Sequence, residues 1–103
     1  MTTLEKLQKA DKTNIVTKKD GLLKQRTIEA INDYRNRDGK FYTTYTSGRG
    51  RFTSNLTNDS IYWVIKLLGY KFQEGNDSPR GGKTGDFIKV SKRAFNNIIS
   101  LIK

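Results

Sequence analysis

The chain has 103 residues, with 20 lysines and arginines against 10 aspartates and glutamates, and it contains no histidine and no cysteine. A chain of this length with 34% hydrophobic residues fills one modest core, which excludes large multidomain enzymes. The missing histidine and cysteine exclude disulfide frameworks, thiolate nucleophiles, imidazole catalysis and the usual zinc ligands. We therefore expect no catalytic residue, no metal and no cofactor. A net charge of +10 predicts an anionic partner, either nucleic acid or an acidic protein surface.

Residues 1–21 form a basic N-terminal segment with five lysines and three acidic residues. Thr2 and Glu5 fit a capping box, and Leu4 and Leu7 are three residues apart, so this segment predicts a short helix. It lacks the apolar run of a signal peptide, and no apolar run in the chain is long enough to span a bilayer. We expect an intracellular protein that does not enter a membrane.

The remaining residues, 22–103, predict a single α+β domain that opens with a helix over about residues 22–36. Asp38-Gly39 is a stop signal for this helix. The predicted helical face consists of Leu23, Thr27, Ile31 and Tyr34.

A β-hairpin is predicted next, because residues 41–46 are aromatic or β-branched and turn residues 47–50 precede a second short strand. Alternation along the first strand places Phe41 in the core and Tyr42 at its rim. Arg49 and Arg51 lie at the turn and are candidate nucleic-acid contacts. The nearby aromatic residues either stack on the bases of a single strand or pack in the core.

A third helix, over about residues 59–68, is expected to be the central core helix, and Gly69 fits a Schellman-type end. Tyr62, Trp63 and Lys66 fall on the side opposite its apolar stripe. They form a candidate protein interface if they are exposed, and the alternative is that the N-terminal segment covers them.

Two strands, 71–74 and 86–90, are predicted to flank an eleven-residue loop that contains four glycines. Arg80 and Lys83 in this loop can reach a DNA backbone or groove, and the alternative is a solvated surface loop. The triplet Gly82-Lys83-Thr84 resembles the end of a nucleotide-binding loop, but the first glycine of that motif is missing.

Ser91 is the predicted N-cap of a last helix, whose apolar stripe includes Phe95 and Ile98. Lys89, Lys92 and Arg93 extend the positive charge of the preceding loop to the start of this helix. Cations at this end oppose the helix dipole, so either a bound anion or solvent must compensate them.

Residues 80–90 resemble the arm-to-strand segment of the HU/IHF family of DNA-bending proteins, in which an Arg-Asn-Pro turn precedes Thr-Gly and a strand. Segments 17–20 and 48–52 resemble two other parts of that family in the same order. Gly81-Gly82 stands where the family has its proline, and residues 53–79 are an insertion relative to its second strand. The resemblance covers less than a third of the chain, and it implies DNA binding.

Together the predicted elements describe a small single α+β domain with three to four helices, two β-hairpins and a winged-helix-like second half. The predicted function is non-enzymatic binding of nucleic acid, duplex DNA ahead of RNA, through basic hairpin loops with low sequence specificity. The alternative is a small viral or mobile-element protein that binds and modulates a host protein or nucleoprotein complex, or a subunit of such an assembly.

Overall fold

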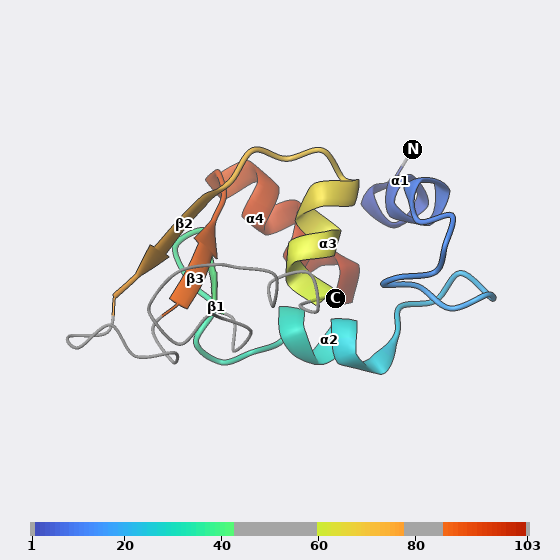
Figure 1. The fold of residues 1–103 in the computed structure, drawn as a ribbon, viewed down its shortest axis with the longest axis horizontal. Helices are drawn as coiled ribbons and strands as arrows, with labels where there is room; N and C mark the ends of the chain where they lie inside the picture. The colour runs from blue at the N-terminus through green and yellow to red at the C-terminus, as the bar shows by residue number, and fades with distance from the viewer. Residues whose placement is uncertain (1, 43–59, 78–85, 103) are drawn as a thin grey trace.

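The computed structural model describes residues 2–42, 60–77 and 86–102. This part of the chain contains four α-helices and a three-stranded antiparallel sheet, so the predicted α+β class is confirmed (Figure 1). The elements are α1 (Thr3–Ala10), α2 (Gln25–Ile31), β1 (Lys40–Tyr42), α3 (Ser60–Leu67), β2 (Gln73–Asn76), β3 (Asp86–Lys89), α4 (Lys92–Ile99) and the 3₁₀ turn η3 (Ser100–Ile102).

The predicted capping box of α1 is present. The hydroxyl of Thr2 accepts a hydrogen bond of 3.1 Å from the Glu5 amide, and the Thr2 amide donates one of 3.0 Å to the Glu5 carboxylate. Each bond satisfies an amide that the helix itself leaves unpaired. Local sequence therefore determines where this helix begins.

A buried carboxylate organises the segment after α1. The Asp11 side chain accepts hydrogen bonds from the amides of Ile15 (2.7 Å), Val16 (2.9 Å) and Thr17 (2.7 Å), and from the Thr17 hydroxyl (2.7 Å). Burial raises the pKa of Asp11, but the hydrogen bonds outweigh this effect and hold the pKa below its usual range. The carboxylate thus fixes residues 15–17 against the end of α1.

The helix predicted over 22–36 is wrong at its start, because α2 begins only at Gln25. Leu23 instead pairs with Thr17 in an antiparallel bridge, and the Lys18 amide donates a 2.7 Å hydrogen bond to the carbonyl of Leu22. Pairing between chain segments has overridden the helical periodicity of the local sequence.

The same prediction is wrong at the other end, because α2 ends at Ile31. The side-chain amide of Asn36 donates to the carbonyls of Ala30 (3.0 Å) and Ile31 (2.9 Å), which satisfies the end of the helix from a following turn. Tyr34 lies beyond the helix and is 94% exposed, so it is not part of the predicted apolar face.

The predicted helix stop at Asp38-Gly39 is a two-residue hairpin turn. Both residues have positive φ, 53° and 81°, as a type I′ turn requires. Arg37 and Lys40 flank the turn and exchange two backbone hydrogen bonds of 3.1 and 2.8 Å. The turn therefore sets where β1 begins.

The sheet has the strand order β1-β3-β2, and both neighbours run antiparallel to β3. The strand predicted at 86–90 is confirmed to within one residue, whereas β2 begins two residues later than the predicted 71–74. The second strand of the hairpin predicted after residue 41 lies outside the described residues. The winged-helix resemblance of the second half stays a prediction.

The core lies where α3 meets α2, the sheet and α4. Figure 1 shows α3 at the centre, with the sheet to one side of it and α1 to the other. The Phe41 and Phe95 rings, 4.7 Å apart, bring α4 against β1. Leu7 and Val16 of the N-terminal segment belong to the same core cluster. Fully buried side chains include Leu7, Val16, Phe41, Ile61, Val64, Ile65, Ile88 and Ile98.

The C-terminus of α3 has the predicted Schellman geometry. Gly69 has a φ of 78°, its amide donates to the Lys66 carbonyl, and the Tyr70 amide donates to the Ile65 carbonyl, both at 3.1 Å. These two bonds satisfy carbonyls that the helix leaves unpaired, and glycine adopts the required φ without steric cost.

Gly69→Val is therefore expected to lower the free energy of unfolding by about 1–2 kcal/mol, because a β-branched side chain resists positive φ. Gly69→Asn, which tolerates this conformation, is expected to cost less. Urea denaturation followed by the fluorescence of Trp63 measures both values. Equal stability of Gly69→Val and wild type would contradict the Schellman assignment.

Candidate nucleic-acid interface

The register of the sheet separates an apolar inner face from an outer face that carries two lysines. Phe41 of β1 pairs with Ile88 of β3, and both side chains are fully buried against the helices. Side chains alternate along a strand, so the residues on either side of this pair point to the opposite face. That outer face carries Lys40 and Tyr42 on β1 and Phe87 and Lys89 on β3.

Lys40 and Lys89 lie directly opposite each other. The amide of Val90 donates a 2.8 Å hydrogen bond to the Gly39 carbonyl, so the alternating ladder makes Lys40–Lys89 a non-hydrogen-bonded pair, in which side chains are closest. Like charges in this arrangement destabilise a sheet. The ammonium group of Lys40 lies 4.7 Å from the Phe87 ring centroid and 3.9 Å from the Asp77 carboxylate.

Lys89 also lines two grooves that continue the positive charge beyond the sheet. One groove is bordered by Lys71, Phe72 and Gln73 of the approach to β2, and the other by Asp38 of the turn and Lys92 of α4. Within the described residues, no carboxylate lies within ion-pair distance of Lys71, Lys89 or Lys92. We call Lys40, Lys71, Lys89 and Lys92 the basic face.

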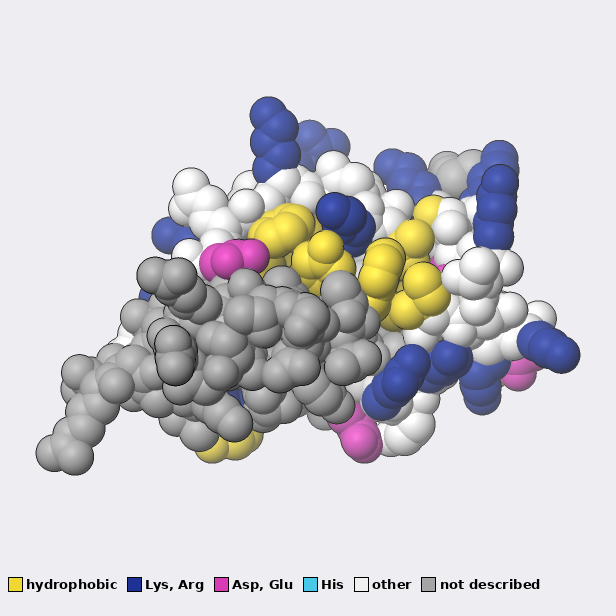
Figure 2. Space-filling view, viewed as in Figure 1, with side chains coloured by type: hydrophobic (Ala, Val, Ile, Leu, Met, Phe, Trp, Pro, Cys, Tyr) yellow, Lys and Arg dark blue, Asp and Glu magenta, His cyan; other side chains and the backbone are white. Residues whose placement is uncertain are grey.

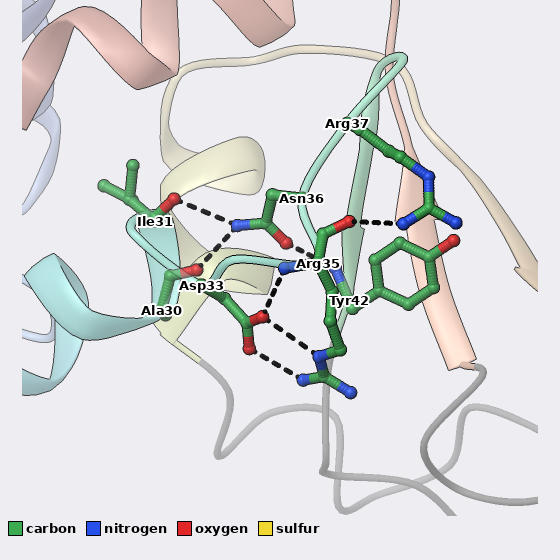
Figure 3. Close-up of polar contacts among 7 residues, drawn as sticks. All are labelled: Ala30, Ile31, Asp33, Arg35, Asn36, Arg37 and Tyr42. Atoms are coloured by element: carbon green, nitrogen blue, oxygen red, sulfur yellow. Dashed lines mark hydrogen bonds and ion pairs between the residues drawn. The ribbon is translucent and has the colours of Figure 1, made fainter.

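A network of polar contacts surrounds Tyr42, the last residue of β1 (Figure 3). Arg35 donates two side-chain hydrogen bonds to Asp33, of 3.0 and 2.7 Å, which hold the pKa of Asp33 below its usual range. The guanidinium carbons of Arg35 and Arg37 lie 5.6 and 5.5 Å from the ring centroid of Tyr42. Asn36 accepts a 2.9 Å hydrogen bond from the Tyr42 amide and so joins this turn to β1.

Tyr42 is only 6% exposed although it belongs to the outer face. Its hydroxyl donates a hydrogen bond to the Asp77 carboxylate. Burial, together with this hydrogen bond, raises the pKa of Tyr42. The predicted position of Tyr42 at the rim of the core is therefore close to the observed one, and its ring is covered by cationic side chains rather than free to stack on a base.

The candidate residues predicted from sequence divide into two groups. Lys89 and Lys92 line one groove, and Arg93 follows on the exposed first turn of α4. The predicted Ser91 cap is present, since the Ser91 hydroxyl accepts a 3.2 Å hydrogen bond from the Ala94 amide. The four loop candidates, Arg49, Arg51, Arg80 and Lys83, lie outside the described residues.

Sequence reasoning missed Lys40 and Lys71 as members of the basic face. The Asp38-Gly39 dipeptide was a usable signal for a tight hairpin turn, and it would have placed Lys40 at the start of a strand. No local signal indicates that this strand pairs with β3.

The predicted protein-interface residues of α3 are partly accessible. Tyr62 and Trp63 are half-buried with their rings 5.4 Å apart, and Lys66 is exposed with its ammonium group 5.8 Å from the Tyr62 centroid. Phe72 packs edge-on against Tyr62 at 5.9 Å. Figure 2 shows hydrophobic side chains gathered over α3 on the face of the molecule that is in view.

The described residues contain neither a cluster of metal ligands nor a membrane-spanning helix. No group of three or more histidine, cysteine, aspartate or glutamate side chains among them can hold a metal ion. None of the helices in this part of the chain is both long and apolar enough to cross a membrane.

Comparisons with protein-family models, with curated proteins and with solved structures find no match to this chain. Function is therefore inferred from the geometry and charge of the described residues.

Proposed function

We propose that this protein is an intracellular, non-enzymatic nucleic-acid-binding protein whose basic face contacts the phosphates of a duplex, DNA ahead of RNA. Phosphate contacts carry little sequence information, so binding has low sequence specificity. Lys40, Lys71, Lys89 and Lys92 supply the charge, and Arg93 extends it along α4. A duplex backbone presents anions at regular spacing, which matches an extended basic surface better than a single small anion does.

The observation that carries this proposal is the Lys40–Lys89 pair. The two lysines stand directly opposite each other on adjacent strands, where like charges are unfavourable. Asp77 lies 3.9 Å from the Lys40 ammonium group, whereas Lys89 has no carboxylate partner among the described residues. A bound phosphate backbone supplies the missing counter-charge for Lys89 and releases counterions from the nucleic acid.

The surroundings of the basic face favour backbone contacts over the reading of bases. Helix α3, which precedes the β2–β3 hairpin, carries Lys66 as its one basic residue and offers few groups for base edges in a major groove. Tyr42 is covered by Arg35 and Arg37, and the Phe87 ring lies beneath Lys40. Neither aromatic ring of the outer face is available to stack on an unpaired base.

Replacing Lys89 and Lys92 together by alanine is expected to weaken binding to any duplex sequence. The plot of log K against log salt is expected to flatten by about 0.9 for each phosphate of duplex DNA that the variant no longer neutralises. Fluorescence anisotropy of a labelled duplex, titrated at several salt concentrations, measures this slope. A parallel series with duplex RNA establishes the preference between the two nucleic acids.

The matched control is Lys6→Ala with Lys12→Ala, which removes the same charge from exposed positions of the N-terminal segment. This control is expected to keep the wild-type slope. If both double variants change the slope equally, binding depends on net charge alone and the assignment to the basic face is wrong. Absence of salt-dependent binding by wild type would exclude the proposed function itself.

The same titration tests the loop residues predicted from sequence. Arg80→Ala with Lys83→Ala, and separately Arg49→Ala with Arg51→Ala, are expected to reduce the slope if these side chains also contact phosphates. An unchanged slope would confine the interface to the basic face.

A further inference from the structure

A third groove, which shares no residue with the basic face, lies where the N-terminal segment, α2 and the C-terminal turn meet. Its lining is mainly aliphatic, with Leu4, Leu22, Ile28, Leu101 and Ile102 on its walls and Lys18 as its charged residue. An apolar lining cannot compensate a phosphate that has lost its water shell. The groove is therefore unsuited to nucleic acid and calls for an apolar ligand.

Residues 17–23 form a small hairpin, closed by the Thr17–Leu23 bridge, which makes one wall of the groove and holds an aliphatic side chain in solvent. Leu22 is 56% exposed. Its amide donates a 2.9 Å hydrogen bond to the Asp20 carboxylate, and its carbonyl accepts one of 2.7 Å from the Lys18 amide. The side chain of Gln8 donates a 2.7 Å hydrogen bond to the carbonyl of Gly21 and so ties the hairpin to α1. The wall is pre-organised, which lowers the entropy cost of binding at this position.

The net positive charge around this wall favours an acidic partner. Residues 17–25 contain Lys18, Lys19 and Lys24 against Asp20, and no acidic side chain of the described residues lines the groove. A second copy of the chain brings the same lysines and a net charge of +10, so electrostatic repulsion disfavours a symmetric dimer at this groove. A ligand with apolar and acidic faces matches both the lining and the wall.

We propose that the groove binds an acidic amphipathic helix of a partner protein. The apolar residues of such a helix, at spacings of three and four, pack against Leu22, Ile28 and Leu101. Its carboxylates face Lys18 and the neighbouring lysines of the hairpin. The chain then has two separate surfaces, one for a polyanion and one for an acidic protein.

Three synthetic peptides of equal length test this site. The first has leucines at helical spacing with glutamates elsewhere, the second has the same leucines with lysines, and the third keeps the glutamates and replaces the leucines by serines. Only the first is expected to bind saturably and to shift the methyl NMR signals of Leu22, Ile28 and Leu101. Leu22→Ser and Lys18→Glu are each expected to weaken its binding about tenfold, as loss of a central apolar anchor or reversal of a facing charge typically does.

Two controls separate the groove from general effects. Tyr34→Ser removes an exposed aromatic side chain away from the groove, and Lys12→Glu reverses an exposed charge that does not line it; both are expected to leave peptide binding unchanged. Thermal denaturation of Leu22→Ser verifies that it folds. Equal binding of the serine peptide, no shift of the groove methyl signals, or a wild-type dimer that Leu22→Ser dissociates would each overturn the proposal.

Discussion

Asp11→Ala is expected to lower the free energy of unfolding by about 3–5 kcal/mol, because several buried donors lose a charged acceptor at once. The Asp11 side chain is 3% exposed and accepts three backbone amides and one hydroxyl. Water cannot easily replace it there. Urea denaturation at neutral pH, followed by Trp63 fluorescence, measures the loss. A change below about 1 kcal/mol, the scale of one ordinary hydrogen bond, would contradict this role.

The pH dependence of the free energy of unfolding provides an independent check that ionised Asp11 stabilises the fold. The pKa of Asp11 in the folded state lies below its usual range, so its charged form stabilises the fold above the unfolded-state pKa of about 3.9. This stabilisation is lost as the pH falls through the folded-state pKa. Asp11→Asn lacks the ionisation, and the stability difference between it and wild type is expected to shrink as the pH falls below about 4.

Gly39→Ala is expected to lower the free energy of unfolding by about 2–4 kcal/mol, because backbone strain and a steric clash act at the same position. Gly39 has a φ of 81°, and a Cβ atom added there would lie 2.6 Å from the Val90 carbonyl oxygen. The clash falls on backbone next to the hydrogen bond that joins Val90 to Gly39. Thermal denaturation, together with amide exchange of Val90, measures both the stability loss and the opening of the sheet.

Gly69→Ala is the matched control for Gly39→Ala. Gly69 has nearly the same φ, 78°, but no atom lies within 4 Å of the Cβ position. It isolates the conformational cost of about 1 kcal/mol for a residue other than glycine at positive φ. Equal losses from the two substitutions would show that the clash with Val90 contributes nothing.

Helix boundaries set by local hydrogen bonds were predictable from sequence. Thr2 and Glu5 form the predicted capping box, Ser91 caps α4, and Gly69 ends α3. In each case the residues that interact lie within a few positions of one another along the chain. Sequence patterns describe such short-range interactions well.

The helix predicted over 22–36 contains α2, but both predicted ends are wrong because residues just outside α2 form other contacts there. Leu23 pairs with Thr17, whose own position depends on Asp11, and Asn36 satisfies the last carbonyls of α2. Apolar residues at helical spacing do not distinguish a buried helical turn from a buried bridge.

The candidate site was predictable only in part for the same reason. Lys89, Lys92 and Arg93 are close in sequence and could be grouped from their spacing. Lys40 joins them through the pairing of β1 with β3, and no pattern in either strand specifies that partner. The groove below Leu22 likewise combines three separate segments and became apparent only in the folded chain.

The position of β3 in the middle of the sheet has a consequence for the order in which the protein folds during synthesis. Both β1 and β2 form their described ladders with β3, so neither has this partner until residues 86–89 have been made. The hairpin of β2 and β3 closes a short loop, whereas docking of β1 closes a much longer one at greater entropic cost. We therefore expect β1 to lack its β3 partner on the ribosome until residues 86–89 have emerged, whereas the contacts of Asp11 with residues 15–17 join nearby positions and can form earlier.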